Sequence, residues 1–403
     1  MSLPLHTLAQ VEGLGPTPKL LKLLALPEAL ATELPLNRVA VDLRHPSSGK
    51  VLLAALAAAD FGAAFGTIDH VPEAREAGLP LIHSLRRGDV AGSGDVVRVE
   101  SSPGRVGIVH RRGANANTLL LTERCNSLCV MCSQPPRDED DSWRLAEALD
   151  VIPLLDHDIE VLGITGGEPT LLGEGLGRLL EVVRERLPST RLHILTNGRL
   201  FSDPGLVRTV SAGVDAVTWG IPLYAEVARV HDDVVQASGA FDETLEGIHN
   251  LAEAGHDVEI RFVAHAMSLP RLPALAEFIW RNLPFSGHVA LMGLEPMGYA
   301  RKNRDRLWVD PADAAATVAD AAIYLARRGM PVSIYNVPLC LLPRQAWPLA
   351  RQSISDWKQD YAAECEGCAV RTACCGFFIS ADATWRGQRI RPLSAAEMSE
   401  ASA

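Results

Sequence analysis

The feature that most constrains the fold of this chain is an alternation of short apolar runs and amphipathic stretches that begins near residue 116. Runs such as Ile159–Thr165 and Arg191–Thr196 are short and rich in Ile, Leu and Val, which predicts strands. Each is followed by a stretch such as Glu174–Leu187, in which apolar residues recur at helical spacing. Strands that alternate with helices in this way form parallel βαβ units with right-handed crossovers.

Six strand–helix pairs lie between residues 116 and 330. The predicted strands are Asn117–Thr122, Ile159–Thr165, Arg191–Thr196, Asp215–Ile221, Asp257–His265 and His288–Leu294. The predicted helices are Ser142–Leu155, Glu174–Leu187, Pro204–Gly213, Ala240–Gly255, Leu269–Leu283 and Asp310–Gly329. Six units are too few for the closed eightfold barrel, so the sequence predicts an α/β fold with a partial (β/α)6 TIM-like barrel.

The regions on either side of the predicted barrel have a different character. Residues 1–115 predict an N-terminal α+β extension, with a helix at Leu20–Leu34 and a hairpin at Gly94–Arg112 around a Ser-Ser-Pro-Gly turn. Its role does not follow from the sequence. Residues 331–403 begin with a predicted strand, Pro331–Val337, and then become rich in loops and cysteines. We therefore expect three domains, with boundaries at 1–115, 116–330 and 331–403.

Composition excludes several kinds of partner. The net charge is −11, which argues against nonspecific nucleic-acid binding and against docking on anionic membranes. No apolar run reaches about 18 residues, and the first residues lack the pattern of a secretory signal. A cytoplasmic, reducing location is expected, where eight cysteines are more often metal ligands or redox groups than disulfides.

The cysteines fall into two groups, which predicts two metal sites. Three of the eight lie within Cys125–Cys132, and the stretch from there to Cys340 contains none. The first group has the spacing Cys125-x3-Cys129-x2-Cys132 in the loop after the first predicted strand, where barrel enzymes place their active sites. Structural zinc normally takes four protein ligands, and no fourth cysteine or histidine is near. Three thiolates on a [4Fe–4S] cluster would leave one iron open to an external chelate.

This loop resembles the signature of the radical SAM enzymes, whose fold is a six-unit partial barrel. The stretch "GITGGEPTL" (Gly163–Leu171) resembles the Gly-Gly-Glu-Pro motif of that family, and "LTNG" (Leu195–Gly198) also ends a strand as in many relatives. The resemblance implies a [4Fe–4S] cluster on the three cysteines and S-adenosylmethionine bound by Gly166, Gly167 and Glu168. Met131 departs from the aromatic residue that is common before the third cysteine. The alternative is a zinc site or structural cysteines.

The second group resembles the cysteine core of SPASM and twitch extensions, which bind auxiliary iron–sulfur clusters. Its spacing is Cys365-x2-Cys368-x5-Cys374, and Cys340 is the candidate fourth ligand. Four thiolates coordinate one [4Fe–4S] cluster completely, so we expect one auxiliary cluster; a four-cysteine zinc site is the alternative. Cys375 is left over as an inert thiol, a substitute ligand or a redox thiol, of which inert is the simplest.

The stretch Tyr335–Phe378 resembles the C-terminal region of the His-Xaa-Ser system radical SAM maturases of C-type, and the resemblance extends over about residues 90–390. It implies C–H activation that leaves a crosslink or an oxidation in a ribosomally synthesised peptide encoded nearby. The implied partners are this precursor peptide, a flavodoxin or ferredoxin as electron donor, and a second radical SAM maturase. Two alternatives stay open: a radical SAM enzyme acting on a small molecule, and a zinc-binding interaction protein that is not an enzyme.

Further residues are candidates on chemical grounds. Glu168 either orients the amino group of the cofactor or braces its loop, and Asn197 either contacts the cofactor or caps the next helix. Arg261 is the candidate partner of the cofactor carboxylate, because a guanidinium binds a carboxylate bidentately; the alternative is a side chain that points outward. Glu295 is a candidate contact to adenine, cofactor or substrate. 

A last group of residues has simpler interpretations. His231 and Asp232 are expected to cap or brace a loop. The run Arg301–Arg306 is expected to be a solvated loop, with an acidic leader peptide as a further possible ligand. Three tryptophans are expected in the core: Trp308, Trp347 and Trp357.

Overall fold

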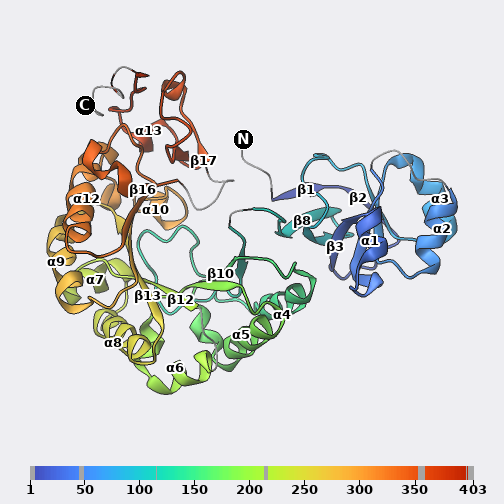
Figure 1. The fold of residues 1–403 in the computed structure, drawn as a ribbon, viewed down its shortest axis with the longest axis horizontal. Coiled ribbons are helices and arrows are strands. Elements are labelled where there is room, and N and C mark those ends of the chain that lie inside the picture. The colour runs from blue at the N-terminus through green and yellow to red at the C-terminus, as the bar shows by residue number, and fades with distance from the viewer. Residues whose placement is uncertain are drawn as a thin grey trace.

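The computed structural model describes residues 5–44, 50–114, 116–212, 217–352, 359–395 and 397. It contains two eight-stranded sheets, one in the N-terminal part and one in the region predicted as a barrel, followed by a cysteine-rich C-terminal segment (Figure 1). In the part of the chain that it describes, no helix is both long and apolar enough to span a bilayer.

The second sheet is the predicted partial barrel. Its strand order is β16-β15-β14-β13-β12-β11-β10-β9, and every neighbouring pair is parallel. The strands are β9 (Thr118–Leu120), β10 (Val161–Thr165), β11 (Arg191–Leu195), β12 (Val217–Pro222), β13 (Asp257–Ala264), β14 (His288–Gly293), β15 (Val332–Tyr335) and β16 (Ala350–Arg351). The six predicted strands and the predicted strand at residues 331–337 are therefore confirmed. Gly213, Asp215 and Ala216, at the ends of predicted elements, lie outside the described residues.

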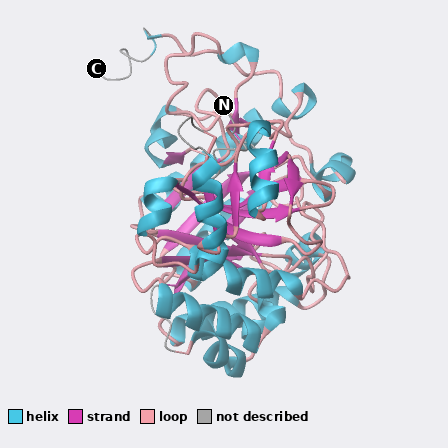
Figure 2. Ribbon diagram, turned by 90° about the vertical axis from the view of Figure 1, so that its right-hand side faces the viewer, coloured by secondary structure: helices cyan, strands magenta, loops and turns pink. Residues whose placement is uncertain are grey.

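Helices cover the outer face of this sheet (Figures 1 and 2). They are α4 (Trp143–Val151), α5 (Glu174–Arg186), α6 (Pro204–Ser211), α8 (Ala240–Glu253), α9 (Leu272–Asn282) and α12 (Pro311–Ala326). Three more helices pack in a separate apolar cluster with Val130 and Met131: α7 (Ala228–Val235), α10 (Tyr299–Lys302) and α11 (Arg304–Leu307). Short 3₁₀ turns flank several of them: η3 (Ile152–Leu154), η4 (Pro169–Leu172), η5 (Arg199–Ser202) and η6 (Leu269–Arg271). The predicted helices are confirmed, and α7 is an addition to them.

Side chains alternate along the strands, which explains why this barrel has a usable interior. On β13, Ile260 and Phe262 are fully buried in the core cluster that the outer helices share. Glu259 and Arg261 alternate with them and therefore lie on the opposite, inner face. A closed TIM barrel fills its interior with branched apolar residues, whereas charged residues at these positions mark an interior that holds polar groups.

The N-terminal sheet closes on itself. Its strand order is β1-β8-β7-β3-β4-β5-β6-β2, and β1 and β2, at opposite ends of that order, are joined by the single residue Ala9. The strands are β1 (His6–Leu8), β2 (Gln10–Glu12), β3 (Lys19–Ala25), β4 (Val39–Asp42), β5 (Ala63–Phe65), β6 (Leu81–His83), β7 (Val96–Glu100) and β8 (Arg105–His110). The helices of this part are α1 (Leu26–Ala31), α2 (Lys50–Ala58) and α3 (Val71–Ala77). Its 3₁₀ turns are η1 (Leu36–Arg38) and η2 (Ile68–His70). The predicted hairpin is confirmed as the antiparallel pair β7–β8.

The predicted helix at Leu20–Leu34 is wrong over its first half. Residues 19–25 form strand β3, and only residues 26–31 are helical. Both faces of β3 are covered: Leu21 and Leu23 belong to one apolar cluster of the closed sheet, and Leu24 belongs to another, under the helices. A strand buried on both faces is apolar at nearly every position, so it lacks the alternation that separates a strand from a helix.

Charged side chains join the N-terminal sheet to the barrel. Lys22 Nζ, which is almost fully buried, lies 2.8 Å from Asp156 Oδ1 and donates to the carbonyl of Leu154 at 2.8 Å. Arg112 binds the same carboxylate with Nε at 2.9 Å and Nη2 at 3.1 Å. Burial alone would raise the pKa of Asp156, but the hydrogen bonds and charges of Arg112 and Lys22 outweigh it and lower the pKa to about 2.

We expect Asp156→Asn to destabilise this junction by about 3 kcal/mol, because Lys22 would keep its buried charge without a counterion. Scanning calorimetry should show an earlier first transition than in the unaltered chain, while the exposed neighbour Asp158→Asn should leave it in place. The Asp156 contribution is complete above its ordinary pKa of 3.8 and is lost as pH falls toward 2. Equal transitions for the two variants at pH 7 would show that the junction does not depend on this charge.

The C-terminal segment contains little regular structure. It holds the 3₁₀ turns η7 (Arg344–Leu349) and η9 (Ala363–Cys365), the strand pair β17 (Gln359–Asp360) and β18 (Phe377–Phe378), and helix α13 (Ala383–Arg386). Trp308 and Trp347 are half-buried at the edges of apolar clusters rather than inside the core, whereas Trp357 lies outside the described residues. Figure 1 shows this segment beside α12, at the end of the barrel away from α6.

Candidate active site

The first cysteine group lies in the loop between β9 and α4, at the carboxyl edge of the parallel sheet. Cys125, Cys129 and Cys132 are free and half-buried. Burial raises the pKa of the Cys125 thiol to about 11 and that of the Cys129 thiol to about 12. Apolar surroundings therefore keep these sulfurs neutral by themselves, and a bound metal centre is the kind of positive charge that would convert them to thiolates.

The loop that follows β10 is hydrogen-bonded directly to the cysteine loop. Gly167 N donates to the carbonyl of Thr122, and Glu168 N donates to that of Arg124, each at 2.8 Å. A Cβ atom on Gly167 would lie 2.2 Å from the carbonyl oxygen of Arg124, and one on Gly166 would lie 2.9 Å from that of Thr122. Glycine is required at these two positions because the two backbones touch there.

The carboxylate of Glu168 is occupied by protein donors. Its Oε1 accepts from Thr170 N at 2.9 Å, from Thr170 Oγ1 at 2.6 Å and from Thr196 Oγ1 at 2.7 Å, and its Oε2 accepts from Asn197 N at 2.6 Å. The side chain is fully buried. This geometry favours the interpretation in which Glu168 braces the ends of β10 and β11, and leaves the backbone of the glycine loop as the part that can meet a ligand.

Asn197 lies against the cysteine loop and also caps the next turn. Its Nδ2 donates to Asn126 Oδ1 at 2.6 Å and lies 3.9 Å from the Cys125 sulfur, while its Oδ1 accepts from Arg199 N at 3.1 Å. The two interpretations left open for this residue are therefore both compatible with its position. A nearby residue that the sequence did not reveal is Arg199, whose Nη1 donates to the carbonyl of Asn126 at 2.5 Å and whose Nε pairs with Glu243 at 2.6 Å.

The other side of the cysteine loop rests on the segment after β14. Tyr299 N donates to the carbonyl of Cys132 at 2.8 Å, and Asn303 Nδ2 donates to that of Val130 at 2.7 Å. Gly298 has a φ of 57°, and a Cβ atom there would lie 2.5 Å from the carbonyl oxygen of Cys132. These contacts hold the loop in place from the side opposite Asn197.

Arg301 and Arg304, in the same segment, do not form a purely solvated loop as expected. Arg301 donates to the carbonyl of Ser380 and lies 3.8 Å from Asp382, and Arg304 donates to the carbonyl of Thr384 at 3.1 Å. Both arginines therefore tie the barrel to the cysteine-rich segment. The proposed role of this run in binding an acidic leader peptide is weakened, because two of its cations are already engaged.

Inside the barrel, Arg261 belongs to a charged network. It pairs with Glu259 on the same strand, and its Nη2 lies 3.3 Å from Met292 Sδ. Glu259 also binds His193 at 3.2 Å and His288 at 2.8 Å. Burial would raise the pKa of Glu259, but these hydrogen bonds and the Arg261 charge hold it well below its usual range. Arg261 does not point outward, and Glu259 competes with a cofactor carboxylate for its guanidinium.

The remaining candidates brace the structure near the site. His231 is buried and its Nδ1 accepts from Tyr224 N at 3.4 Å; burial lowers its pKa to about 4. Asp232 accepts from Gly239 N and Phe241 N at 2.7 and 2.9 Å, as expected for a residue that fixes a loop. Glu295 follows β14, and its carbonyl accepts from Met297 N at 2.9 Å.

The second cysteine group surrounds a hollow of about 330 Å³ that is partly open to solvent. Four cysteines line it: Cys340, Cys365, Cys368 and Cys374. Leu339 N donates to the Cys374 sulfur at 3.4 Å and Leu393 N donates to the Cys368 sulfur at 3.4 Å, and hydrogen bonds of this kind tune cluster thiolates. Over the described ranges, no group of three or more His, Cys, Asp or Glu side chains is arranged to hold a single metal ion.

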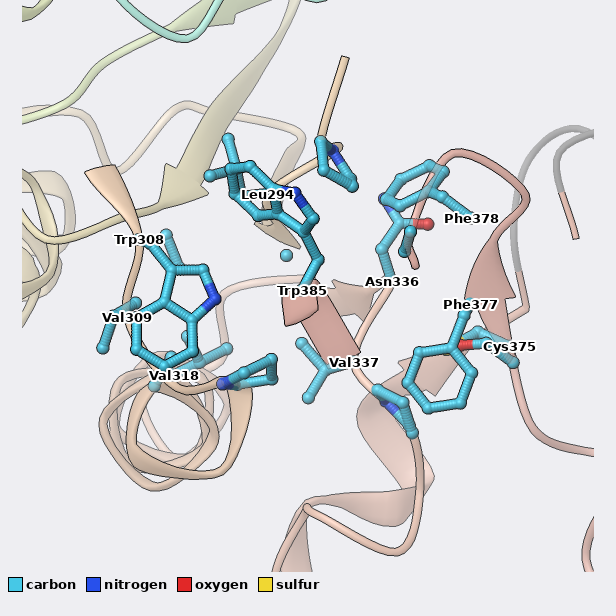
Figure 3. Close-up of a pocket in the computed structure, with 18 residues that line it drawn as sticks. Leu294, Trp308, Val309, Val318, Asn336, Val337, Cys375, Phe377, Phe378 and Trp385 are labelled. Carbon is cyan, nitrogen blue, oxygen red and sulfur yellow. The ribbon is translucent and has the colours of Figure 1, made fainter. Parts of the chain in front are cut away.

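Cys375 lines a different hollow, which we call the aromatic pocket after Trp308, Phe377, Phe378 and Trp385 in its wall (Figure 3). The thiol of Cys375 is 4% exposed and donates to the carbonyl of Gly376 at 3.3 Å. A side-chain hydrogen bond from Cys375 lowers the pKa of Cys374 to about 6. Cys374 thus lines the cysteine-lined hollow, whereas Cys375, whose side chain contacts that of Cys374, lines the aromatic pocket.

Comparison with known proteins gives the class of this fold and site. Residues 119–271 match the model of the Radical SAM superfamily. This region is a radical SAM domain, with the α/β fold of that superfamily. Proteins of this superfamily are enzymes that use S-adenosylmethionine and a [4Fe–4S] cluster, so the matched region is the kind of domain that works with these cofactors.

Two curated relatives are similar over the same part of the chain. Fe-coproporphyrin III synthase of Methanosarcina barkeri is 29% identical over 163 residues, which is 40% of this chain and 39% of that protein. AdoMet-dependent heme synthase of Oleidesulfovibrio alaskensis is 26% identical over 156 residues, 37% of this chain and 38% of that protein. The chain thus matches about two fifths of the length of each. Among solved structures, Streptococcus suis SuiB bound to S-adenosylmethionine has a TM-score of 0.43 at 17% identity, covering 54% of this chain and 49% of SuiB.

Proposed function

We propose that this chain cleaves S-adenosylmethionine reductively and uses the resulting radical to modify a ribosomally synthesised peptide. The observation that carries the proposal is the presence of two cysteine groups joined by one segment: three cysteines in the loop after β9, and four around the C-terminal hollow. Three thiolates leave one iron of a cube open for the cofactor, whereas four thiolates close a second cube. Arg301 and Arg304 tie the segment that supports the first group to Ser380 and Thr384 of the C-terminal segment.

In this proposal, Cys125, Cys129 and Cys132 hold the first cluster, and the loop of Gly166 and Gly167 meets the amino group of the cofactor. A [4Fe–4S] cluster held there would supply the one electron needed for reductive cleavage of S-adenosylmethionine, and with it the capacity to remove a hydrogen atom from the substrate. Asn197 contacts the cysteine loop, and Arg199 and Asn303 hold it in position. The inner face of the barrel orients the reactants and excludes water.

The auxiliary [4Fe–4S] cluster is assigned to Cys340, Cys365, Cys368 and Cys374 within residues 331–403. Residues 116–330 would form the barrel domain, to whose sheet the next segment adds β15 and β16, and residues 1–115 would form the N-terminal extension. A flavodoxin or ferredoxin is the proposed electron donor, and the reducing cytoplasm is the proposed location. Arg261 is the proposed partner of the cofactor carboxylate, provided that it exchanges Glu259 for that group on binding.

The peptide substrate is supported by the resemblance of Tyr335–Phe378 to the His-Xaa-Ser system maturases. A second candidate comes from the relatives, whose names describe haem and coproporphyrin synthesis. Coproporphyrin carries several carboxylates, and none of the described residues in the wall of the hollow around Trp308 and Trp385 has a charged side chain. Burying carboxylates among apolar groups is costly, so this pocket favours an uncharged peptide side chain over a porphyrin.

Co-expression with the short peptide encoded nearby tests the proposal. We expect mass spectrometry to find a peptide that has lost hydrogen through a crosslink or an oxidation, and we expect the purified chain to contain about eight irons. The matched control is the same co-expression with Cys129→Ala, which should leave the peptide unmodified. An unmodified peptide together with conversion of a porphyrin would support the second candidate, and stoichiometric zinc without iron would contradict both.

A further inference from the structure

The aromatic pocket is a second binding site beside the auxiliary cluster. It is a hollow of about 800 Å³, open solvent included, between the ends of β13–β15, helix α12 and residues 375–385 (Figure 3). Sites for small ligands and side chains are typically concave and mostly apolar, as this hollow is. Asn336 and Cys375 are the polar members of the wall, and the rest is aliphatic, aromatic, proline or glycine. An occupant should therefore be uncharged.

The tryptophan side chains in the wall of the pocket are held in place by Arg304 before a ligand binds. The guanidinium of Arg304 lies 5.2 Å from the ring centre of Trp308 and 5.3 Å from that of Trp385. It also donates to the carbonyl of Thr384, next to Trp385 in the chain. Cation–π contacts to both rings fix them in one arrangement, which lowers the entropy that a ligand must overcome. Four aromatic side chains in the wall favour an aromatic ring as the occupant.

Trp308 adds a requirement for a hydrogen-bond acceptor. Its indole nitrogen is buried and has no hydrogen-bond partner among the described residues. In Figure 3 this nitrogen lies on the edge of the ring that faces Val337 and Trp385, toward the middle of the pocket. A buried donor without an acceptor is costly, so an occupant that offers an oxygen atom here gains affinity over one that does not.

The pocket adjoins the hollow of the second cysteine group. Pro338, Gly376 and Phe377 line both, so one thin wall separates a ring in the pocket from the four cysteines. We propose that the aromatic pocket binds a tyrosine side chain of the substrate peptide, with its ring among the four aromatic side chains and its phenol oxygen on the indole N–H of Trp308. This rests on the proposed peptide substrate. Among aromatic peptide side chains, tyrosine stays uncharged over the physiological pH range, in which histidine titrates, and it carries an oxygen atom that can accept at that point.

Binding of two neutral probes to the reconstituted full-length chain tests the inference. N-acetyl-tyrosinamide and N-acetyl-phenylalaninamide differ only in the hydroxyl, and ligand-observed NMR titration gives a Kd for each without S-adenosylmethionine or reductant. We expect the tyrosine probe to bind about five- to tenfold more tightly, as one additional hydrogen bond allows. Trp308→Phe, which keeps a ring but removes the donor, should make the two affinities equal.

Two further pairs of variants place the binding in this pocket. Ala314 on α12 lines the pocket and Ala316 is on the exposed face of the same helix. Ala314→Leu should weaken both probes about tenfold by filling the site, and Ala316→Leu should change neither. Trp347→Phe is the control for Trp308→Phe, because the indole of Trp347 donates to Leu342 O at 3.2 Å outside the pocket. Iron content identical to that of the unaltered chain shows that each variant is folded.

Equal affinities of the two probes for the unaltered chain would overturn the inference, and so would unchanged binding to Ala314→Leu. Displacement of the tyrosine probe by a carboxylated porphyrin would also overturn it, since the pocket would then accept charge. The outcome is separate from that of the proposed function, because no turnover is involved. A co-expressed peptide that stays unmodified while the tyrosine probe binds in the pocket would contradict the proposed function alone.

Discussion

A Cys129→Ala chain, reconstituted without oxygen, is expected to hold about four irons instead of about eight and to release no 5′-deoxyadenosine on reduction. Two remaining thiolates cannot fix a four-iron cube in one orientation, so the open iron would no longer face the cofactor. Cys129 is the most informative of the three positions, because it packs against the apolar cluster that contains Val130, Met131 and Tyr224. Alanine is apolar as well, so the loop should keep its fold without the sulfur.

Iron analysis and chromatographic assay of 5′-deoxyadenosine measure the two effects separately. The matched control is Leu128→Ala in the same loop, since Leu128 is 53% exposed and carries no ligand atom; it should retain about eight irons. If Cys129→Ala still cleaved S-adenosylmethionine, the first cluster would be held elsewhere and the assignment of the loop would be wrong. If it lost all eight irons, the two cysteine groups would not be independent sites.

The barrel could be predicted because its physical signals are local. In β13, Ile260 and Phe262 are apolar because helices cover them, and the helices that follow each strand have apolar faces of their own. Once strands and helices alternate, the right-handed crossover of each βαβ unit and the short connections between elements leave few possible topologies for the sheet. The sequence also places the cysteine loop and the glycine loop at neighbouring strand ends, and the hydrogen bonds from Gly167 and Glu168 confirm that these loops meet.

The closure of the N-terminal sheet and its strand β3 could not be predicted from local sequence patterns. Its closure depends on β1 pairing with β8 and β2 pairing with β6, and these partners are distant in the chain. Leu21, Leu23 and Leu24 are buried on opposite faces of one strand, so their apolar run has no period from which the strand could be recognised.

The supports of the cysteine loop escaped prediction for the same reason. Asn303 binds the carbonyl of Val130 across 173 residues, and Arg199 binds that of Asn126 across 73. Neither belongs to a motif, and a polar residue after a strand has many possible partners. Arg304 had the simplest interpretation, that of a solvated cation. Trp308 is close to it in the sequence, but the second ring, that of Trp385, lies beside Arg304 only after folding.

The second large expected effect is the loss of one iron–sulfur cluster when Cys374, but not its neighbour Cys375, is replaced. Cys374→Ala is expected to retain about four irons and to form 5′-deoxyadenosine at an undiminished rate, yet to yield no finished peptide product. The reason is position: Cys374 lines the hollow with three other cysteines, and its sulfur accepts from Leu339 N and Gly376 N at 3.4 and 3.5 Å. Mössbauer spectroscopy and iron analysis report the loss of one cluster.

Cys375→Ala is the matched control, because it removes the same atom from the next residue. It should retain about eight irons, since Cys375 lines the aromatic pocket and is not among the residues that line the cysteine-lined hollow. Loss of the cluster in Cys375→Ala with retention in Cys374→Ala would exchange the two assignments, and loss in both would make Cys375 a structural requirement of the wall. Retention in Cys375→Ala with altered affinity for the tyrosine probe would instead show that this residue serves the pocket, which the spacing of the cysteines alone gave no reason to expect.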